Sequence, residues 1–190
     1  MLPRVLWLIG GGLLALPLAA ILTPQEAPLA LKILVMALLL TSGLRPFWGL
    51  AALAAIGPIV VPLTIASGQP PWGGNETLEA LVLATIAGIA LRWGVTGAPP
   101  RGRIGRPALV LGAVVAASAV SLLSVQQLTV APLPAFLAQC WSHVTHDYFM
   151  DPRAFPAWHQ AAIWVEGLLL AVIIERVVLA TPANGWRLAG

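Results

Sequence analysis

Hydrophobic residues gather into six long runs along this chain, and few charged residues interrupt them. A bilayer core of about 30 Å requires about 20 apolar residues in a helix, and the runs are close to that length. One stretch, 29–67, is nearly twice as long as a single span. Arg45-Pro46 in its middle indicates a tight helical hairpin, because proline disfavours a helical conformation at the preceding residue. We predict an all-α fold, a polytopic transmembrane helix bundle with spans at about 5–22, 29–44, 48–67, 78–93, 107–125 and 160–180.

The basic residues indicate how the bundle is oriented. Cytoplasmic connections of membrane proteins carry an excess of Lys and Arg. With the amino terminus inside, eight of the ten basic residues fall on the cytoplasmic side, and only Lys32 and Arg153 fall outside. We therefore expect both termini to be cytoplasmic. The first run, with Arg4 before it, also resembles a secretory signal peptide, although its apolar length exceeds the usual 7–15 residues.

Composition supports a membrane location independently of the runs. Apolar residues make up 59% of the chain and charged residues 9%, against roughly 25% charged residues in soluble domains. The net charge of +3 comes from basic residues scattered at the ends of the runs, so we expect no nucleic-acid partner. A single lysine among many arginines is typical of a GC-rich bacterial genome. We predict one transmembrane domain, 1–190, in the bacterial inner membrane.

Potential metal ligands gather in one external loop, 126–159, which contains all three histidines, the single cysteine and both aspartates. Cys140, His143 and His146 are spaced i, i+3 and i+6, and Asp147 follows the last of them. On a helix, three of these side chains share roughly one face. Zinc uses such ligands. The spacing is not a known metal signature, however, and we expect neither a metal nor another cofactor.

The same loop segment has a second interpretation as an amphipathic helix at the membrane interface. Its aromatic residues are interleaved with polar ones, and Trp141, Phe149 and Phe155 are expected to hold the helix against the outer leaflet. We favour this interpretation. Haem ligation, as in a subunit of a redox complex, is a further alternative for the segment.

Two of the predicted spans contain residues that affect helix packing. In lipid, helices associate through close contact between small residues. In the fifth span Ala113, Ala117 and Ser121 recur at every fourth position, so we expect this face to contact another helix. The third span contains Pro58 and Pro62, and each removes a backbone hydrogen bond, so a kink is expected there.

Glu166 is the least expected residue in the chain. It lies inside the sixth predicted span, where an acidic group at the helix centre costs roughly 2.5–3.5 kcal/mol on insertion scales. Such a residue is a functional candidate by default. The alternative is a protonated or hydrogen-bonded glutamate that serves packing alone. In both cases we expect it to face the bundle interior, toward the third span or toward Gly112, Ala116 and Ala117 of the fifth.

Polar candidates also occur just before the sixth span. Arg153 is the one basic residue clearly on the outer side. It can hold a phosphate, since guanidinium matches phosphate geometry bidentately, or it can pair with Asp147 or Asp151. The candidate site residues are, in all, Glu166, Arg153, His146 and His159.

The last two spans carry a family resemblance. The run 109–124 (LVLGAVVAASAVSLLS), the external stretch after it, the segment 162–170 (AIWVEGLLL) and the exit at 183–190 are similar to the amino-terminal half of O-antigen ligase and O-antigen polymerase family membrane proteins. The similarity covers about 105–190. Such proteins are large all-helical bundles that transfer glycans from an undecaprenyl-pyrophosphate carrier without metal or nucleotide. Their functional arginines and histidine lie mainly in a periplasmic loop of the second half, and nothing in this sequence matches that loop.

The resemblance implies that this chain is the non-catalytic amino-terminal portion of a glycan ligase or polymerase. Its partners would be membrane lipid, a polyprenyl-linked glycan, and a missing carboxy-terminal half or other membrane subunits. The last residues, 188–190, read as the start of another apolar run, which favours a longer protein. The alternative is a self-contained six-span transporter or an accessory subunit of a membrane complex, with function at Glu166 and the third span. Whether the chain itself is an enzyme stays open.

Overall fold

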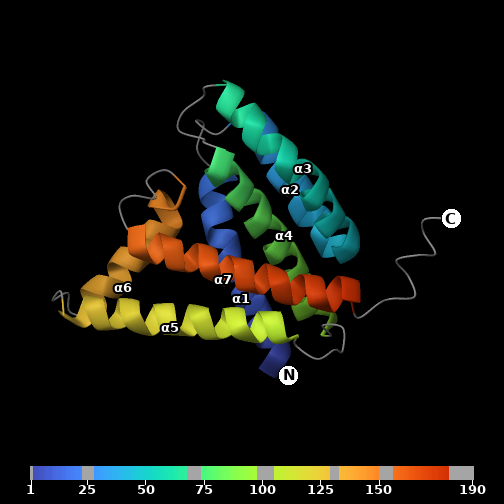
Figure 1. Ribbon diagram of the computed structural model, residues 1–190. Coiled ribbons are helices and arrows are strands. Elements are labelled where there is room, and N and C mark those ends of the chain that lie inside the picture. The colour runs from blue at the N-terminus through green and yellow to red at the C-terminus, as the bar shows by residue number, and fades with distance from the viewer. Residues whose placement is uncertain are drawn as a thin grey trace.

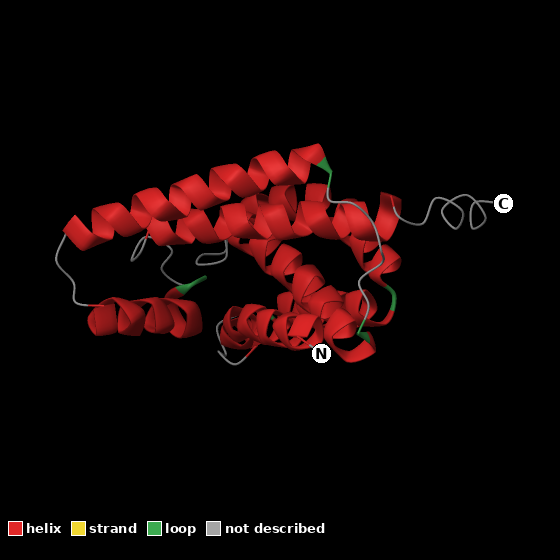
Figure 2. Cartoon of the chain, turned by 90° about the horizontal axis from the view of Figure 1, so that it is seen from below, coloured by secondary structure: helices red, strands yellow, loops and turns green. Residues whose placement is uncertain are grey.

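The computed structural model describes residues 2–22, 28–67, 74–97, 105–128, 133–149 and 156–179. These residues form seven α-helices, and π-helical turns follow the last two of them. The described part contains helices and short loops and no strand (Figure 2). The prediction of an all-α fold is therefore confirmed for this part of the chain.

Six of the helices lie where the sequence predicted spans, and their boundaries differ from the predicted ones by a few residues. They are α1 (Leu2–Leu22), α2 (Leu29–Leu44), α3 (Pro46–Ser67), α4 (Gly74–Thr96), α5 (Arg106–Leu128) and α7 (Pro156–Ile174), which continues as the π-helical η3 (Glu175–Leu179). The additional helix lies in the predicted loop and consists of α6 (Leu133–Ser142) and the π-helical η1 (His143–Asp147). A short helix was expected in this loop.

The predicted hairpin between the second and third runs is confirmed. Arg45 interrupts the helix with φ −140° and ψ 87°, and Pro46 begins α3. Proline suits the first helical position, because its missing N–H would have no helical partner there. Arg92 of α4 donates hydrogen bonds to the Gly43 carbonyl, at 3.1 Å, and to the Leu44 carbonyl. The guanidinium therefore binds the carboxyl end of α2.

Helix α4 is the centre of the molecule and packs against α1, α2, α3 and α7 (Figure 1). Glycines on α4 permit this close packing. A Cβ atom added at Gly88 would collide with the Leu39 carbonyl of α2, and one added at Gly94 would meet Leu8 of α1. Opposite α4, Gly57 of α3 faces Leu78 in the same way. Small residues thus determine how near three helices come to α4.

Within the described residues, one helical stretch is long and apolar enough to cross a membrane, namely Glu76–Thr96 in α4. Its most apolar window is 67% buried inside the protein, and a buried helix in the core of a soluble protein has the same properties. Four further apolar stretches of 10–17 residues lie in α1, α2, α3 and α5. Helix α3 continues without interruption through Pro58 and Pro62.

Helices α5 and α7 run antiparallel, side by side, across α1 and α4 (Figure 1). Gly112 of α5 lies close to Leu168 of α7. A Cβ atom added at Gly112 would lie 3.9 Å from the Leu168 side chain, at van der Waals distance. The predicted contact face of α5 is wrong for this chain, because Ala113, Ala117 and Ser121 are all exposed. Since α5 lies at the edge of the bundle with α7 as its main neighbour, only the adjoining face of α5 is covered.

The segment after α6 folds back against α1, and this changes one expectation. Phe149 was expected at the outer leaflet, but it is 3% exposed and belongs to the main hydrophobic core with Leu18, Val35 and Leu81. Trp141 is exposed. Phe155, the third aromatic residue of that prediction, lies outside the described residues. The amphipathic segment therefore directs one of its aromatic side chains into the protein.

Candidate functional site

Five polar or titratable side chains from three parts of the chain meet inside the bundle. Glu79 comes from α4, His143 and Tyr148 come from the segment after α6, and His159 and Glu166 come from α7. The two α7 residues are separated by two helical turns, so they lie on the same face of the helix. We call these five residues the polar cluster.

Tyr148 connects the two glutamates. Its hydroxyl oxygen lies 2.5 Å from Glu166 Oε1 and 3.0 Å from Glu79 Oε1, both within hydrogen-bonding distance. His159 Nε2 lies 3.5 Å from Glu79 Oε2. The Tyr148 ring also contacts the imidazoles, with its centroid 4.8 Å from that of His159 and 5.7 Å from that of His143. The cluster is thus one connected network with the phenol at its centre.

Burial makes this network unusual. Tyr148 is 4% exposed, Glu166 5% and His159 8%, and buried polar groups are stable only when they are paired. Burial, and next the nearby carboxyl groups of Glu166 and Glu79, raise the pKa of the Tyr148 phenol well above its ordinary value. The phenol therefore keeps its proton across the physiological pH range and remains a hydrogen-bond donor.

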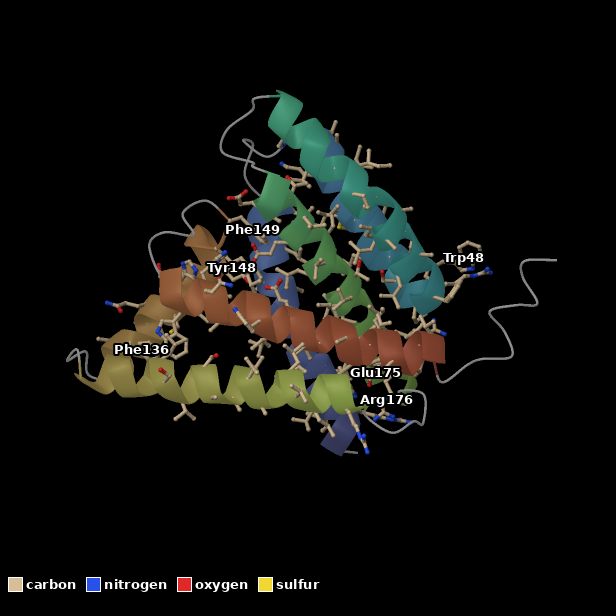
Figure 3. The ribbon with its side chains drawn as sticks, viewed as in Figure 1. Trp48, Phe136, Tyr148, Phe149, Glu175 and Arg176 are labelled. Carbon is tan, nitrogen blue, oxygen red and sulfur yellow. The ribbon has the colours of Figure 1, made fainter. Side chains whose placement is uncertain are left out.

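The π-helical turn η1 determines where Tyr148 lies. Such turns in otherwise α-helical segments are frequent at functional sites. Thr145 stabilises the turn by donating its hydroxyl to the Trp141 carbonyl at 2.8 Å. The ring of Phe149 packs edge-on against Tyr148 with centroids 4.9 Å apart. Figure 3 shows the two rings together near the start of α7, whereas Glu175 and Arg176 lie at its other end.

The polar cluster forms part of the wall of a cavity of about 580 Å³. Apolar side chains of α1, α6 and α7 make up most of the lining, among them Leu14, Leu137 and Val165. Tyr148 of the polar cluster contributes a hydroxyl group to that lining, and Glu166 contributes a carboxyl group. A mostly apolar cavity with a few converging polar groups is the usual form of a small-molecule site.

The predicted site residues have different outcomes. Glu166 faces the interior, as expected, but its neighbours are Tyr148 and Glu79. The expectation that it faces α3 or the small residues of α5 is therefore wrong, because its carboxyl group points toward Tyr148 of the segment after α6, which also contacts Glu79 of α4. His159 belongs to the cluster. Arg153 and the side chain of His146 lie outside the described residues, as do the side chains of the proposed partners of Arg153.

Glu79 and Tyr148 were not among the predicted site residues. Tyr148 is the single tyrosine of the chain, and Glu79 is an acidic residue near the start of a long apolar helix. Both features are visible in the sequence. Neither indicates that the two side chains meet, since 69 residues separate them along the chain.

The metal interpretation of Cys140, His143 and His146 gains no geometric support. Among the described side chains, no group of three or more His, Cys, Asp and Glu residues is placed to hold a metal ion. Residues i, i+3 and i+6 share a face on an α-helix, but the segment is π-helical from His143 with i→i+5 bonding, so the α-helical spacing behind this interpretation does not hold there. Burial also raises the pKa of the Cys140 thiol, which disfavours the thiolate that metals bind.

A second polar contact connects the start of α5 to the end of α7. The backbone N–H of Gly105, just before α5, donates to Glu175 Oε2 at 2.8 Å. A carboxylate at a helix amino terminus satisfies a free N–H group and interacts favourably with the helix dipole. This contact fixes the end of α7 to the start of α5.

Comparison of the chain with protein-family models, curated proteins and solved structures finds no match. The resemblance to O-antigen ligases and polymerases therefore stays a prediction. The function has to be argued from the cavity, the polar cluster and the surface of this chain.

Proposed function

We propose that this chain is a multi-pass protein of the bacterial inner membrane, with α1, α2, α3, α4, α5 and α7 as its spans and both termini in the cytoplasm. Large aliphatic side chains cover its outward faces, and a water-soluble protein rarely exposes so many of them together. The exposed side chains include Leu6, Ile9 and Leu13 of α1, Leu29, Ile33 and Leu40 of α2, and Leu109, Val110 and Val120 of α5.

Aromatic residues at the α2–α3 hairpin support the same membrane location. Phe47 and Trp48 are exposed, and Trp48 projects away from the bundle (Figure 3). Tryptophan beside a basic residue, here the exposed Arg45, is typical of a membrane–water interface. α4 is shielded by its neighbours, which explains why it is the most buried of the long apolar helices.

The topology is tested by labelling single cysteines with a membrane-impermeant reagent in intact cells, on a Cys140→Ser background. Gly74→Cys is expected to react, because it precedes the fourth span on the outer side. Gly102→Cys is expected to be protected until the membrane is permeabilised. Labelling of Gly102→Cys but not of Gly74→Cys in intact cells would contradict the orientation.

Within this bundle, the chain binds a polyprenyl-linked saccharide carrier and serves as the non-catalytic amino-terminal portion of a glycan ligase or polymerase. The observation that carries this proposal is the cavity of about 580 Å³, which is mostly apolar and has the polar side chains of His143, Tyr148 and Glu166 in its wall. An isoprenoid chain requires an apolar lining, and the hydroxyl groups of a sugar head group require hydrogen-bond acceptors. The same cavity offers both.

The binding proposal is tested with two substitutions on one helix. Ala119 of α5 lines the cavity, while Ala117, two residues earlier, is exposed. Ala119→Trp should fill the cavity and lower the affinity for undecaprenyl phosphate by about tenfold or more, in line with pocket contacts of roughly 1–3 kcal/mol. Ala117→Trp is the control and should bind normally. Equal binding by both variants in native mass spectrometry would rule out this cavity as the site.

A second function, proton-coupled transport, is favoured by the convergence of two carboxyl groups, the buried one of Glu166 and the half-buried one of Glu79, on one phenol, since acidic relays are typical of such proteins. Glu166→Gln separates the two functions. As part of a glycan ligase, the variant should keep its fold and most of the activity of the complete protein. As a transporter, it should lose proton-coupled flux at normal expression.

The uncovered face of α5 is the place where a partner would bind. Ala113, Ala117 and Ser121 form a strip of small residues on its exposed side, and such strips let membrane helices approach closely. Further helices of a longer protein or another membrane subunit would cover this strip in the assembled complex.

A further inference from the structure

The number of hydrogen atoms available at Tyr148 is smaller than its two contacts require. A phenol carries one hydrogen and accepts through its oxygen lone pairs. Tyr148 has carboxyl oxygens at 2.5 Å and 3.0 Å, one from Glu166 and one from Glu79. Its single hydrogen can serve one of them. If both glutamates were ionised, the other contact would bring two lone-pair oxygens together, so one carboxyl group has to supply a hydrogen.

The surroundings of the two glutamates identify which of them is protonated. Glu79 has a second partner, since His159 Nε2 lies 3.5 Å from its other carboxyl oxygen. Glu166 is 5% exposed, and among the described residues its hydrogen-bond partner is Tyr148. An isolated buried carboxylate is far more costly than a neutral carboxyl group, whereas an imidazole N–H beside Glu79 stabilises its charge.

We propose that Glu166, Tyr148 and Glu79 form a binding site for one proton. The Glu166 carboxyl group donates to the Tyr148 oxygen, and the Tyr148 hydroxyl donates to the Glu79 carboxylate. His159 faces the second oxygen of Glu79. The proposal goes beyond ligand binding, because it holds whether or not a polyprenyl chain occupies the cavity.

The arrangement also defines a path for that proton. When the hydrogen of Glu166 moves to the Tyr148 oxygen, the original phenol hydrogen moves to Glu79. Glu166 becomes a carboxylate, Glu79 becomes a neutral carboxyl group, and Tyr148 ends unchanged, so no charge remains on the phenol. Because Glu166 lines the cavity and Glu79 belongs to α4, the transfer carries a proton from the cavity wall to the central helix.

The titratable groups among the described side chains around the site come from four elements. The titratable neighbours of Glu166 are Glu79 from α4, Tyr148 and His143 from the segment after α6, His159 from its own helix, and Cys140 from α6. Helices α1 and α5 present apolar side chains to the cavity. The side chains of His146 and Asp147 lie outside the described part.

Infrared spectroscopy of the full chain in lipid measures the proton directly, because a protonated carboxyl group has a carbonyl stretching band that carboxylates lack. At neutral pH we expect this band in the unmodified protein and its loss in Glu166→Gln. The amide of that variant still donates to Tyr148, so the fold is kept. Glu79→Gln should retain the band, since an amide oxygen accepts from Tyr148 as a carboxylate does. Glu76→Gln, one turn earlier on α4, is the control and should leave it unchanged.

Tyr148→Phe tests the bridge itself. Removing the phenol oxygen takes away the acceptor of the Glu166 hydrogen, so the band should move to higher frequency. Absence of the band in the unmodified protein, survival in Glu166→Gln, or loss in Glu79→Gln would overturn the proposal, and an unshifted band in Tyr148→Phe would remove Tyr148 from it. Circular dichroism of each variant confirms that the helices are intact.

Discussion

Helix α4 has two sides that are packed in opposite ways. Toward α2 and the amino-terminal part of α1, small residues bring the backbones together, because a Cβ added at Gly88 would collide with the Leu39 carbonyl and one added at Gly94 with Leu8. Toward α7, the segment after α6 and the carboxyl-terminal part of α1, Leu83 borders a cavity of about 580 Å³, and Glu79 reaches the polar cluster. Protein interiors are normally close-packed and apolar. The tight side follows that rule, while the open side departs from it in both volume and polarity.

The difference indicates where stability and function reside in this chain. Departures from consistent packing are concentrated at functional sites in natural proteins. The side facing α2 holds α4 in place, which keeps Glu79 at a fixed position. The side facing α7 then presents a cavity and a buried proton site on that fixed support.

The largest expected effect tests the tight side. Gly88→Ala puts a methyl group against the α2 backbone at Leu39, which should destabilise the fold by about 3 kcal/mol, at the upper end for overpacking. Gly167→Ala is the matched control, because nothing lies within 4 Å of its added Cβ, and it should stabilise α7 by about 0.5–1 kcal/mol. Unfolding of both variants in detergent, followed by circular dichroism, measures the effects. Equal stability of the two would contradict the contrast between the sides.

A smaller effect is expected on the open side. Tyr148→Phe leaves the buried Glu166 and the half-buried Glu79 without their shared partner, and the expected loss is about 2 kcal/mol. A double-mutant cycle with Glu166→Gln should give a coupling energy of about 1 kcal/mol or more, since the two side chains are in contact. Additive effects of the two substitutions would show that the bond between them contributes nothing.

The smallest expected effect lies away from both sides, at the contact between α5 and α7. Glu175→Gln weakens the bond to the Gly105 N–H and removes the charge at the start of α5. Such an end charge contributes about 0.3–1 kcal/mol. The loss should be measurable at low salt and shrink as salt is added. A loss as large as that of Tyr148→Phe would mean that the polar cluster is not the main polar determinant of stability.

The sequence predicted the helices much better than the site. Long apolar runs and the Arg45-Pro46 break are local signals, and the helix boundaries follow them closely. Glu166 was recognised because a carboxyl group in an apolar run is costly wherever it lies. Its partners Tyr148 and Glu79 come from other elements, and the tyrosine and the second glutamate are 69 residues apart. Only the way the helices pack brings them together.

The same limit explains two of the packing predictions that were wrong. A strip of small residues on α5 indicates a surface suited to contact, but it does not determine whether this chain supplies the contacting helix. Phe149 belongs to a segment in which aromatic and polar residues are interleaved, and this pattern is typical of a helix at the membrane interface. The direction in which the segment after α6 folds, against α1, depends on contacts far along the chain.

The open side is tested most directly at Cys140, the single cysteine of the chain and part of the cavity lining. An apolar, uncharged thiol reagent should modify Cys140 slowly in the purified protein, and undecaprenyl phosphate should slow the reaction severalfold further by filling the cavity. In a Cys140→Ser background, Ala138→Cys on the exposed face of α6 should react at the same rate with and without the lipid. We expect protection to be confined to Cys140. An unchanged rate at Cys140 under saturating lipid would contradict lipid binding in the cavity.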